Sequence, residues 1–206
     1  FTLYLIFLNK IDAQENALKV GVSCVDVSPT VFPIQLRSGK SSYVHDPLHV
    51  RAVAFESGEG RAVICLIDAI GIGRETSDLA KSRAAEKTGW QKEDMLICAT
   101  HTHSAPKGGT GMPGREAYEK LKHDKLEEAI VLAIERLKPA KVGFSSEDEP
   151  SEVRNRRWFL EPGTMPPNPL GEKDQVKTNA GRNHLVKPAG PIDPEICVID
   201  VRNSKN

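Results

Sequence analysis

The stretch RAVICLIDAIGIGRETSDLAKSRAAEKTGWQKEDMLICAT (Arg61–Thr100) decides the fold class of this chain. It opens with an apolar run over residues 61–72, continues with a polar segment that stops at Gly89, and closes with a second apolar run over residues 93–100. Nearly continuous apolar runs are typical of strands covered on both faces, and glycine commonly terminates a helix. A helix between two such strands implies a crossover connection. The stretch therefore predicts an α/β domain.

The segments before this stretch add two strands. Residues 17–29 read as a strand that a Ser-Pro pair stops. Residues 48–57 alternate between apolar and polar side chains, and Gly58-Glu59-Gly60 joins them to the apolar run that follows. Two strands separated by such a short glycine-containing turn predict a β-hairpin.

The segments after it add a second helix and two more strands. Residues 114–139 carry an apolar stripe at helical spacing, and residues 140–147 and 195–201 read as strands. We therefore expect a mixed, largely parallel sheet flanked by helices. Residues 148–187 are rich in proline, glycine, asparagine and charge, and they predict a long irregular loop before the last strand.

Composition excludes some classes of function. The chain has 206 residues, which suits one domain, and its 28 basic and 28 acidic side chains give no net charge. A nucleic-acid partner, which needs a basic face, is not expected. The cysteines, Cys24, Cys65, Cys98 and Cys197, form no CxxC pair, so we expect buried free thiols rather than a structural zinc cluster. Spacing alone leaves an oxidised pair open.

The first residues read as a leader. FTLYLIFL is apolar but far too short to span a bilayer, and it resembles the core of a secretory signal. We expect residues 1–16 to be a partial signal peptide, with cleavage after Ala13 plausible, and residues 17–206 to be a secreted or periplasmic domain. An ordinary N-terminal strand is the alternative. The sequence leaves the oligomeric state open.

The stretch ICATHTHSAP (Ile97–Pro106) places two histidines at the end of a predicted strand, and Asp68 ends the neighbouring apolar run. Sites in open α/β sheets form beyond the carboxyl ends of the strands. In an extended segment His101 and His103 point to one face, roughly 6–7 Å apart. Both imidazoles could reach one metal, or one could bind it while the other contacts the substrate; a catalytic zinc usually has three protein ligands. His45 is kept as a site-edge residue.

Several stretches together resemble a known family. ICATHTHSAP resembles the His-Thr-His-Ser-Gly/Ala-Pro signature in the N-terminal domain of neutral/alkaline ceramidases. VDVSP, VHDPLHVRAVAFE, LIDAIGI and NRR follow the family pattern in order, and PAGPIDPE is similar to its bacterial relatives. The resemblance runs from about Val20 to the end of the chain, and the histidine block is its most specific part.

The resemblance implies a zinc-dependent amidase that hydrolyses the N-acyl bond of ceramide to sphingosine and a fatty acid. His101 would then be a zinc ligand, and His103 would contact the substrate. Arg156, with Asn155 beside it, would bind the polar head or the oxyanion that develops during amide hydrolysis. Asp68 is our own addition as a carboxylate that lines or supports the site.

The remaining zinc ligands of ceramidases come from farther along their chains, so we expect a fragment that by itself binds zinc weakly. Two alternatives stay open: a non-catalytic secreted domain of the same fold, and a metallohydrolase acting on another ester or amide. The expected partner is a lipid or N-acyl amide, and peripheral membrane contact is an option for reaching it.

Overall fold

The structure, a computed structural model, describes residues 17–36, 39–106 and 114–204. The chain divides into two compact units, and we describe each by itself: residues 1–141 with 201–206 form unit 1, and residues 142–200 form unit 2. The predicted leader lies outside the described residues. No helix in the described part of the chain is long and apolar enough to span a membrane.

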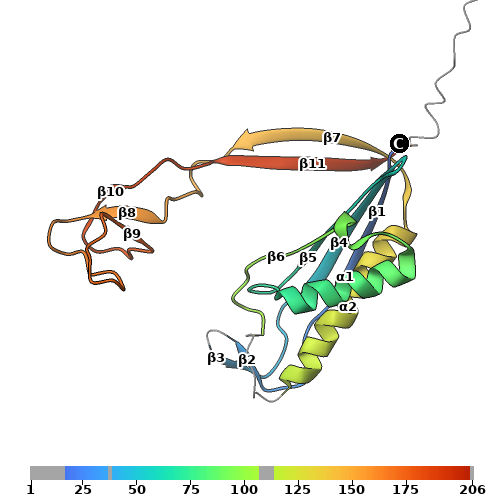
Figure 1. The fold of residues 1–206 in the computed structure, drawn as a ribbon, viewed down its shortest axis with the longest axis horizontal. Coiled ribbons are helices and arrows are strands. Elements are labelled where there is room, and N and C mark those ends of the chain that lie inside the picture. The colour runs from blue at the N-terminus through green and yellow to red at the C-terminus, as the bar shows by residue number, and fades with distance from the viewer. Residues whose placement is uncertain (1–16, 37–38, 107–113, 205–206) are drawn as a thin grey trace, which may run out of the picture. The chain divides into compact units, whose positions relative to one another are not determined.

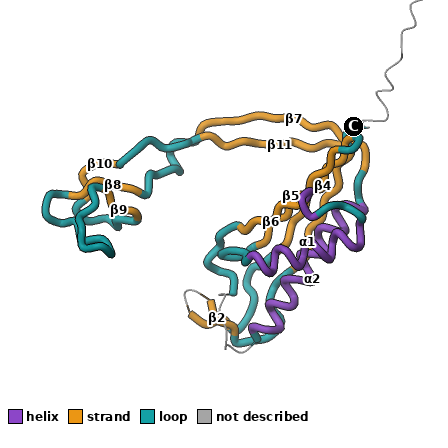
Figure 2. The backbone as a smooth tube through the Cα atoms, in the orientation of Figure 1, coloured by secondary structure: helices purple, strands orange, loops and turns teal. Residues whose placement is uncertain are grey.

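Unit 1 contains the predicted strands and helices. Its strands are β1 (Lys19–Asp26), β4 (His49–Ser57), β5 (Gly60–Ile67) and β6 (Met95–Ala99), with the short hairpin β2 (Ile34–Leu36) and β3 (Gly39–Ser41). Its helices are α1 (Arg74–Thr88) and α2 (Arg115–Glu135), with the 3₁₀ turn η1 (Lys92–Asp94) before β6. Both helices fall in this unit (Figure 2). As predicted, α1 ends at Gly89, whose backbone is left-handed (φ 73°).

The main sheet has the order β11-β7-β1-β4-β5-β6 (Figure 1). The mixed α/β class is confirmed, but the expectation of a largely parallel sheet is wrong. Only β5 and β6 pair in parallel, through the α1 crossover, whereas β1–β4, β4–β5 and β1–β7 are antiparallel. The second helix causes the difference, because the chain leaves α2 beside β1 instead of adding a strand next to β6.

The core lies between one face of this sheet and the helices. Helix α2 packs on β1, β4 and β5, and α1 packs on α2. Ile67, Leu126 and Ile130 are among the largest fully buried side chains. Burying a side chain of this size contributes about 1.5–3 kcal/mol, so these residues fix the helices on the sheet.

Helix α2 approaches β1 closely because β1 has small residues on the face toward it. Gly21 lies under the α2 backbone, and the Ser23 hydroxyl donates a hydrogen bond of 2.7 Å to the Ala129 carbonyl oxygen. Ala129 and Ala133 are themselves fully buried. Small side chains on both elements therefore set the distance between helix and sheet.

The other face of the sheet keeps apolar side chains exposed. Val22, Ile64 and Leu96 are 55%, 43% and 57% exposed. They lie in one row, because Val22 pairs with Val53, Val53 with Ile64, and Ile64 with Leu96. The apolar runs predicted strands covered on both faces, yet within the described residues of unit 1 the helices cover only one.

The four cysteines are free. Cys65 is buried, as expected, and burial raises the pKa of its thiol to about 12. Cys98 is half-buried, but Cys24 and Cys197 are exposed, which contradicts the expectation for these two. Cys24 is exposed because it lies on the uncovered face of β1, beside Val22.

Unit 2 holds part of β7 (Lys138–Asp148) and of β11 (Glu195–Asn203), and a small sheet of β8 (Arg157–Leu160), β9 (Val176–Thr178) and β10 (Leu185–Pro188) in the order β10-β8-β9. The long irregular loop expected over residues 148–187 therefore contains strands. Its richness in proline and glycine concealed them, because each strand has only three or four residues, too few for an alternating pattern to stand out.

Replacing Gly21 with alanine is expected to destabilise unit 1 by about 1–3 kcal/mol, as overpacking does in other cores. A Cβ at this position would overlap the Ala133 carbonyl oxygen and lie 2.8 Å from the Leu137 backbone nitrogen, so α2 would have to move. Urea unfolding measures the change as a lower midpoint. Gly143→Ala is the matched control in a strand, since no described atom lies within 4 Å of its Cβ. Equal midpoints for the two variants would contradict the packing described here.

Candidate functional site

The predicted site residues of unit 1 lie where β5 and β6 end. These strands are parallel neighbours with Ile67 opposite Ala99, so Asp68 and Thr100 leave the sheet side by side. The Thr100 amide donates a hydrogen bond of 3.0 Å to the Ile67 carbonyl oxygen and continues the ladder by one residue. The expectation that the two strands are neighbours is confirmed.

The Asp68 carboxylate connects three strand ends. Its Oδ2 accepts hydrogen bonds from the His49 backbone N–H at 2.9 Å and from Arg51 Nη1 at 3.0 Å, both on β4. Thr100, which follows β6, donates to the same carboxylate. The side chain is only 17% exposed.

These contacts set the charge state of Asp68. Partial burial alone raises the pKa of a carboxyl group. The hydrogen bonds from His49, Arg51 and Thr100, together with the Arg51 charge, outweigh burial and hold the Asp68 pKa below its ordinary value. Asp68 is therefore a fixed anion that organises the strand ends, and it has no spare proton to give.

His101 has an unusual backbone and an anchored ring. Its φ is 62°, in the left-handed region that non-glycine residues seldom adopt. Its Nδ1–H donates to the Ile70 carbonyl oxygen at 2.6 Å. That bond fixes the tautomer, so Nε2 carries the lone pair and is the nitrogen available to a ligand.

His103 lies beside it. The two imidazole rings have centroids 5.2 Å apart and meet edge to face at 69°. Both residues are exposed, and Thr102 between them is half-buried. The Thr102 hydroxyl accepts a hydrogen bond of 3.3 Å from the Ser104 amide, which helps to hold the turn that carries the two rings.

The donor set suits zinc in kind but not in number. Imidazole is a common zinc ligand, and a hydrogen bond from the other ring nitrogen to a carbonyl is the usual support for one. A catalytic zinc needs three protein ligands. Within residues 17–36, 39–106 and 114–204, no three histidine, cysteine, aspartate or glutamate side chains gather as a metal-binding group.

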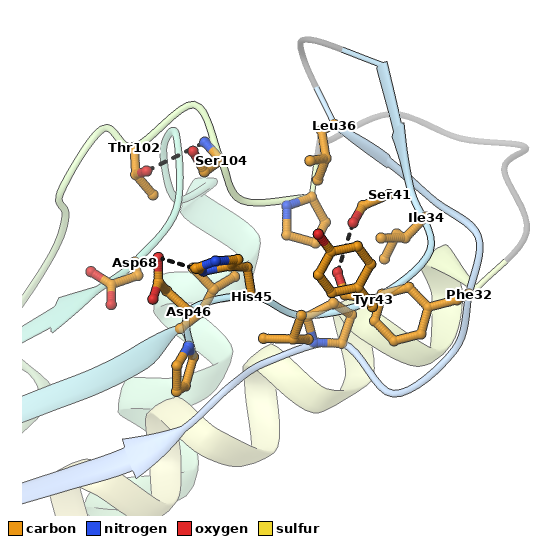
Figure 3. A pocket seen from close by; sticks show the side chains of 15 residues that line it. Phe32, Ile34, Leu36, Ser41, Tyr43, His45, Asp46, Asp68, Thr102 and Ser104 are labelled. Atoms are coloured by element: carbon orange, nitrogen blue, oxygen red, sulfur yellow. Dashed lines mark hydrogen bonds and ion pairs between the residues drawn. The ribbon is translucent and has the colours of Figure 1, made fainter.

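A pocket of about 540 Å³ adjoins this turn (Figure 3). One wall comes from the β2–β3 hairpin and the segments next to it, and the opposite side carries Asp68, Thr102 and Ser104. An isolated bridge between Leu36 and Pro106 connects the hairpin with the segment that follows the histidines. His45 lines the pocket, which agrees with its assignment as a site-edge residue.

Asn155 and Arg156 belong to unit 2, and their surroundings are defined there. The Asn155 side chain donates to the Pro191 carbonyl at 2.9 Å and accepts from the Arg157 amide at 2.9 Å. Arg156 Nε donates to Asn179 Oδ1 at 3.0 Å. Both side chains therefore organise the loop before β8, and their proposed contact with a substrate stays a prediction.

Sequence reasoning missed several parts of the site. The Ile70 carbonyl has no signature in the sequence, because every residue has one. The hairpin wall with Phe32, Ile34 and Tyr43 lies far along the chain from the histidines, and its three-residue strands were not predicted. The paired Arg51 could have been suspected from its place on the strand next to Asp68.

Asp68→Asn is expected to lower the free energy of unfolding at pH 7 by about 1–3 kcal/mol, the contribution of hydrogen bonds to a charged group. Because the folded-state pKa is lowered, the stabilisation is present above the unfolded-state value, about 3.9, and is lost as the pH falls through the folded-state value. Urea unfolding between pH 7 and pH 3 should show the two proteins converging in acid. Asp46→Asn, at an exposed carboxylate, is the control. A constant or growing difference in acid would contradict the clamp.

Comparison with known proteins bears on the fold. No protein-family profile and no curated protein matches the chain. Among solved structures, the neutral ceramidase of Pseudomonas aeruginosa matches with a TM-score of 0.65 and 18% sequence identity, over 92% of this chain and 30% of that chain. A ceramidase complexed with C2 matches with a TM-score of 0.64 and 18% identity, over 92% and 29%. This chain thus spans about 30% of the ceramidases that it matches. It has the fold of part of a neutral ceramidase, as the sequence resemblance predicted.

Proposed function

We propose that this chain forms part of the active site of a zinc-dependent hydrolase that cleaves the N-acyl bond of a ceramide-like lipid. The observation that carries the proposal is the anchoring of His101. Its Nδ1 donates to the Ile70 carbonyl, and its left-handed backbone turns the ring at the end of a parallel strand pair. This is the support that a metal-binding imidazole requires.

The likeness of fold supports the choice of reaction. The solved structures similar to this chain are ceramidases, and the His-Thr-His block follows the family pattern at the strand end. A shared fold by itself does not establish activity. The argument therefore depends on the histidine geometry and on the apolar pocket next to it.

Each residue then has a role of its own. His101 would hold the zinc through Nε2, and zinc would supply Lewis-acid polarisation of the scissile carbonyl. His103, exposed beside it, would contact the substrate and move protons, as imidazoles do near neutral pH. Arg156 would stabilise negative charge on the carbonyl oxygen, with Asn155 as its neighbour. Asp68 would act indirectly, by holding the strand ends from which His101 projects.

One observation favours a second candidate, a non-catalytic domain of the same fold. The described residues bring only two imidazoles together, one fewer than the protein ligands of a catalytic zinc. Such a domain would keep the Asp68 clamp and the pocket without turning over a substrate. Metal binding and hydrolysis, measured together, separate the two candidates.

His101→Asn is expected to weaken zinc binding by more than about 100-fold, since changing only the residues that support a ligand costs 10–100-fold. Asparagine is chosen because it tolerates left-handed backbone. Equilibrium dialysis against Zn²⁺ measures the affinity, and release of fatty acid from a fluorescent ceramide measures hydrolysis, with and without a chelator.

His184→Asn is the matched control. His184 also has left-handed backbone (φ 60°), and its Nδ1 lies 3.0 Å from Glu161 Oε2, but it belongs to unit 2. This variant should bind zinc as the unaltered protein does. Unchanged zinc affinity in His101→Asn would refute the metal role, and zinc binding without hydrolysis would favour the second candidate.

A further inference from the structure

The pocket beside the histidine turn has an apolar interior. Phe32, Ile34, Leu36 and Leu48 line it with their hydrocarbon side chains, and the Tyr43 ring lies among them (Figure 3). Its volume of about 540 Å³ falls in the range of small-molecule sites. An interior of this kind gains free energy from covering a hydrocarbon chain.

The charged groups around the pocket are of one sign. Its lining includes two carboxylates, Asp46 and Asp68, and neither lysine nor arginine is among these described residues. Asp68 is already paired with Arg51 at 3.0 Å. The Asp46 side chain is 92% exposed, and its neighbour His45 lies 3.3 Å away. The carboxylate that remains for a ligand is therefore at the solvent-exposed side of the pocket.

We propose that this pocket binds a long-chain aliphatic amine, with the hydrocarbon chain inside and the ammonium group at Asp46. The identity of this ligand as a reaction product rests on the proposed function. Hydrolysis breaks the amide C–N bond, adds the oxygen of water to the acyl carbon, and yields a carboxylate and an ammonium: R–CO–NH–R′ + H₂O → R–COO⁻ + R′–NH₃⁺. Of the two products, the lining complements the ammonium and repels the carboxylate.

The pocket also shares a turn with the proposed metal ligand. Thr102 and Ser104 line it, while His101 and His103 alternate with them along the chain. A substrate whose amine half occupies the pocket therefore has its amide close to this turn. The same contacts hold the amine after cleavage, so the enzyme is subject to inhibition by its amine product and not by its fatty acid.

The test compares dodecylamine with dodecanoate, which share a chain length and carry opposite charge. Isothermal titration of the metal-free protein at pH 7, below the micelle concentrations, should give about three- to tenfold tighter binding of dodecylamine, the range expected for one exposed charge contact. Butylamine, with the same ammonium and a short chain, should bind more than about 100-fold more weakly than dodecylamine.

Two variants locate the contact. Asp46→Asn should reduce the preference for dodecylamine to less than twofold, and it is expected to fold because Asp46 is exposed. Glu59→Gln, in the turn at the other end of the β4–β5 hairpin, should leave the preference unchanged. Tyr43→Ala should weaken both twelve-carbon ligands alike, since Tyr43 contacts the chain rather than the head.

Equal affinity for the amine and the carboxylate, or an undiminished preference in Asp46→Asn, would overturn the inference. So would equal affinity for butylamine and dodecylamine. The titration involves neither zinc nor hydrolysis, so its outcome is independent of the metal test. Amine selectivity without zinc binding would leave the pocket assignment intact and refute the proposed function, and zinc-dependent hydrolysis without amine selectivity would do the reverse.

Discussion

The Asp68 carboxylate is the contact on which the candidate site depends. It joins β4, through the His49 amide and the Arg51 side chain, to the segment that follows β6, through Thr100. Parallel pairing of β5 and β6 is what brings Asp68 and Thr100 together. The next residues in each segment, up to Ile70 and His101, then meet in the hydrogen bond that fixes the imidazole.

Much of the fold could be predicted from local patterns. The hairpin was found because its turn is short and contains glycine, and α1 because Gly89 stops it. The direction of the sheet was mispredicted, because a sequence shows that α2 follows β6 but not that the chain then pairs beside β1. The small strands around Trp158 were missed because their partners lie up to about 30 residues away and each strand is very short.

The candidate site divides in the same way. The spacing of His101 and His103 and the position of Asp68 at a strand end are visible in the sequence, and the structure places all three at one edge of the sheet. The hydrogen bond to the Ile70 carbonyl and the left-handed backbone at His101 depend on tertiary structure. The hairpin wall that makes a pocket out of this edge comes from residues more than 50 positions earlier.

X-ray diffraction at the zinc absorption edge, on crystals of this protein grown with excess Zn²⁺, tests the central claim most directly. The account predicts an anomalous peak about 2.0–2.1 Å from His101 Nε2, the usual zinc–imidazole distance, with Nδ1 still bonded to the Ile70 carbonyl. Zinc elsewhere in the crystal with no peak at His101 would contradict it, and so would a metal bound through Nδ1 with that hydrogen bond broken.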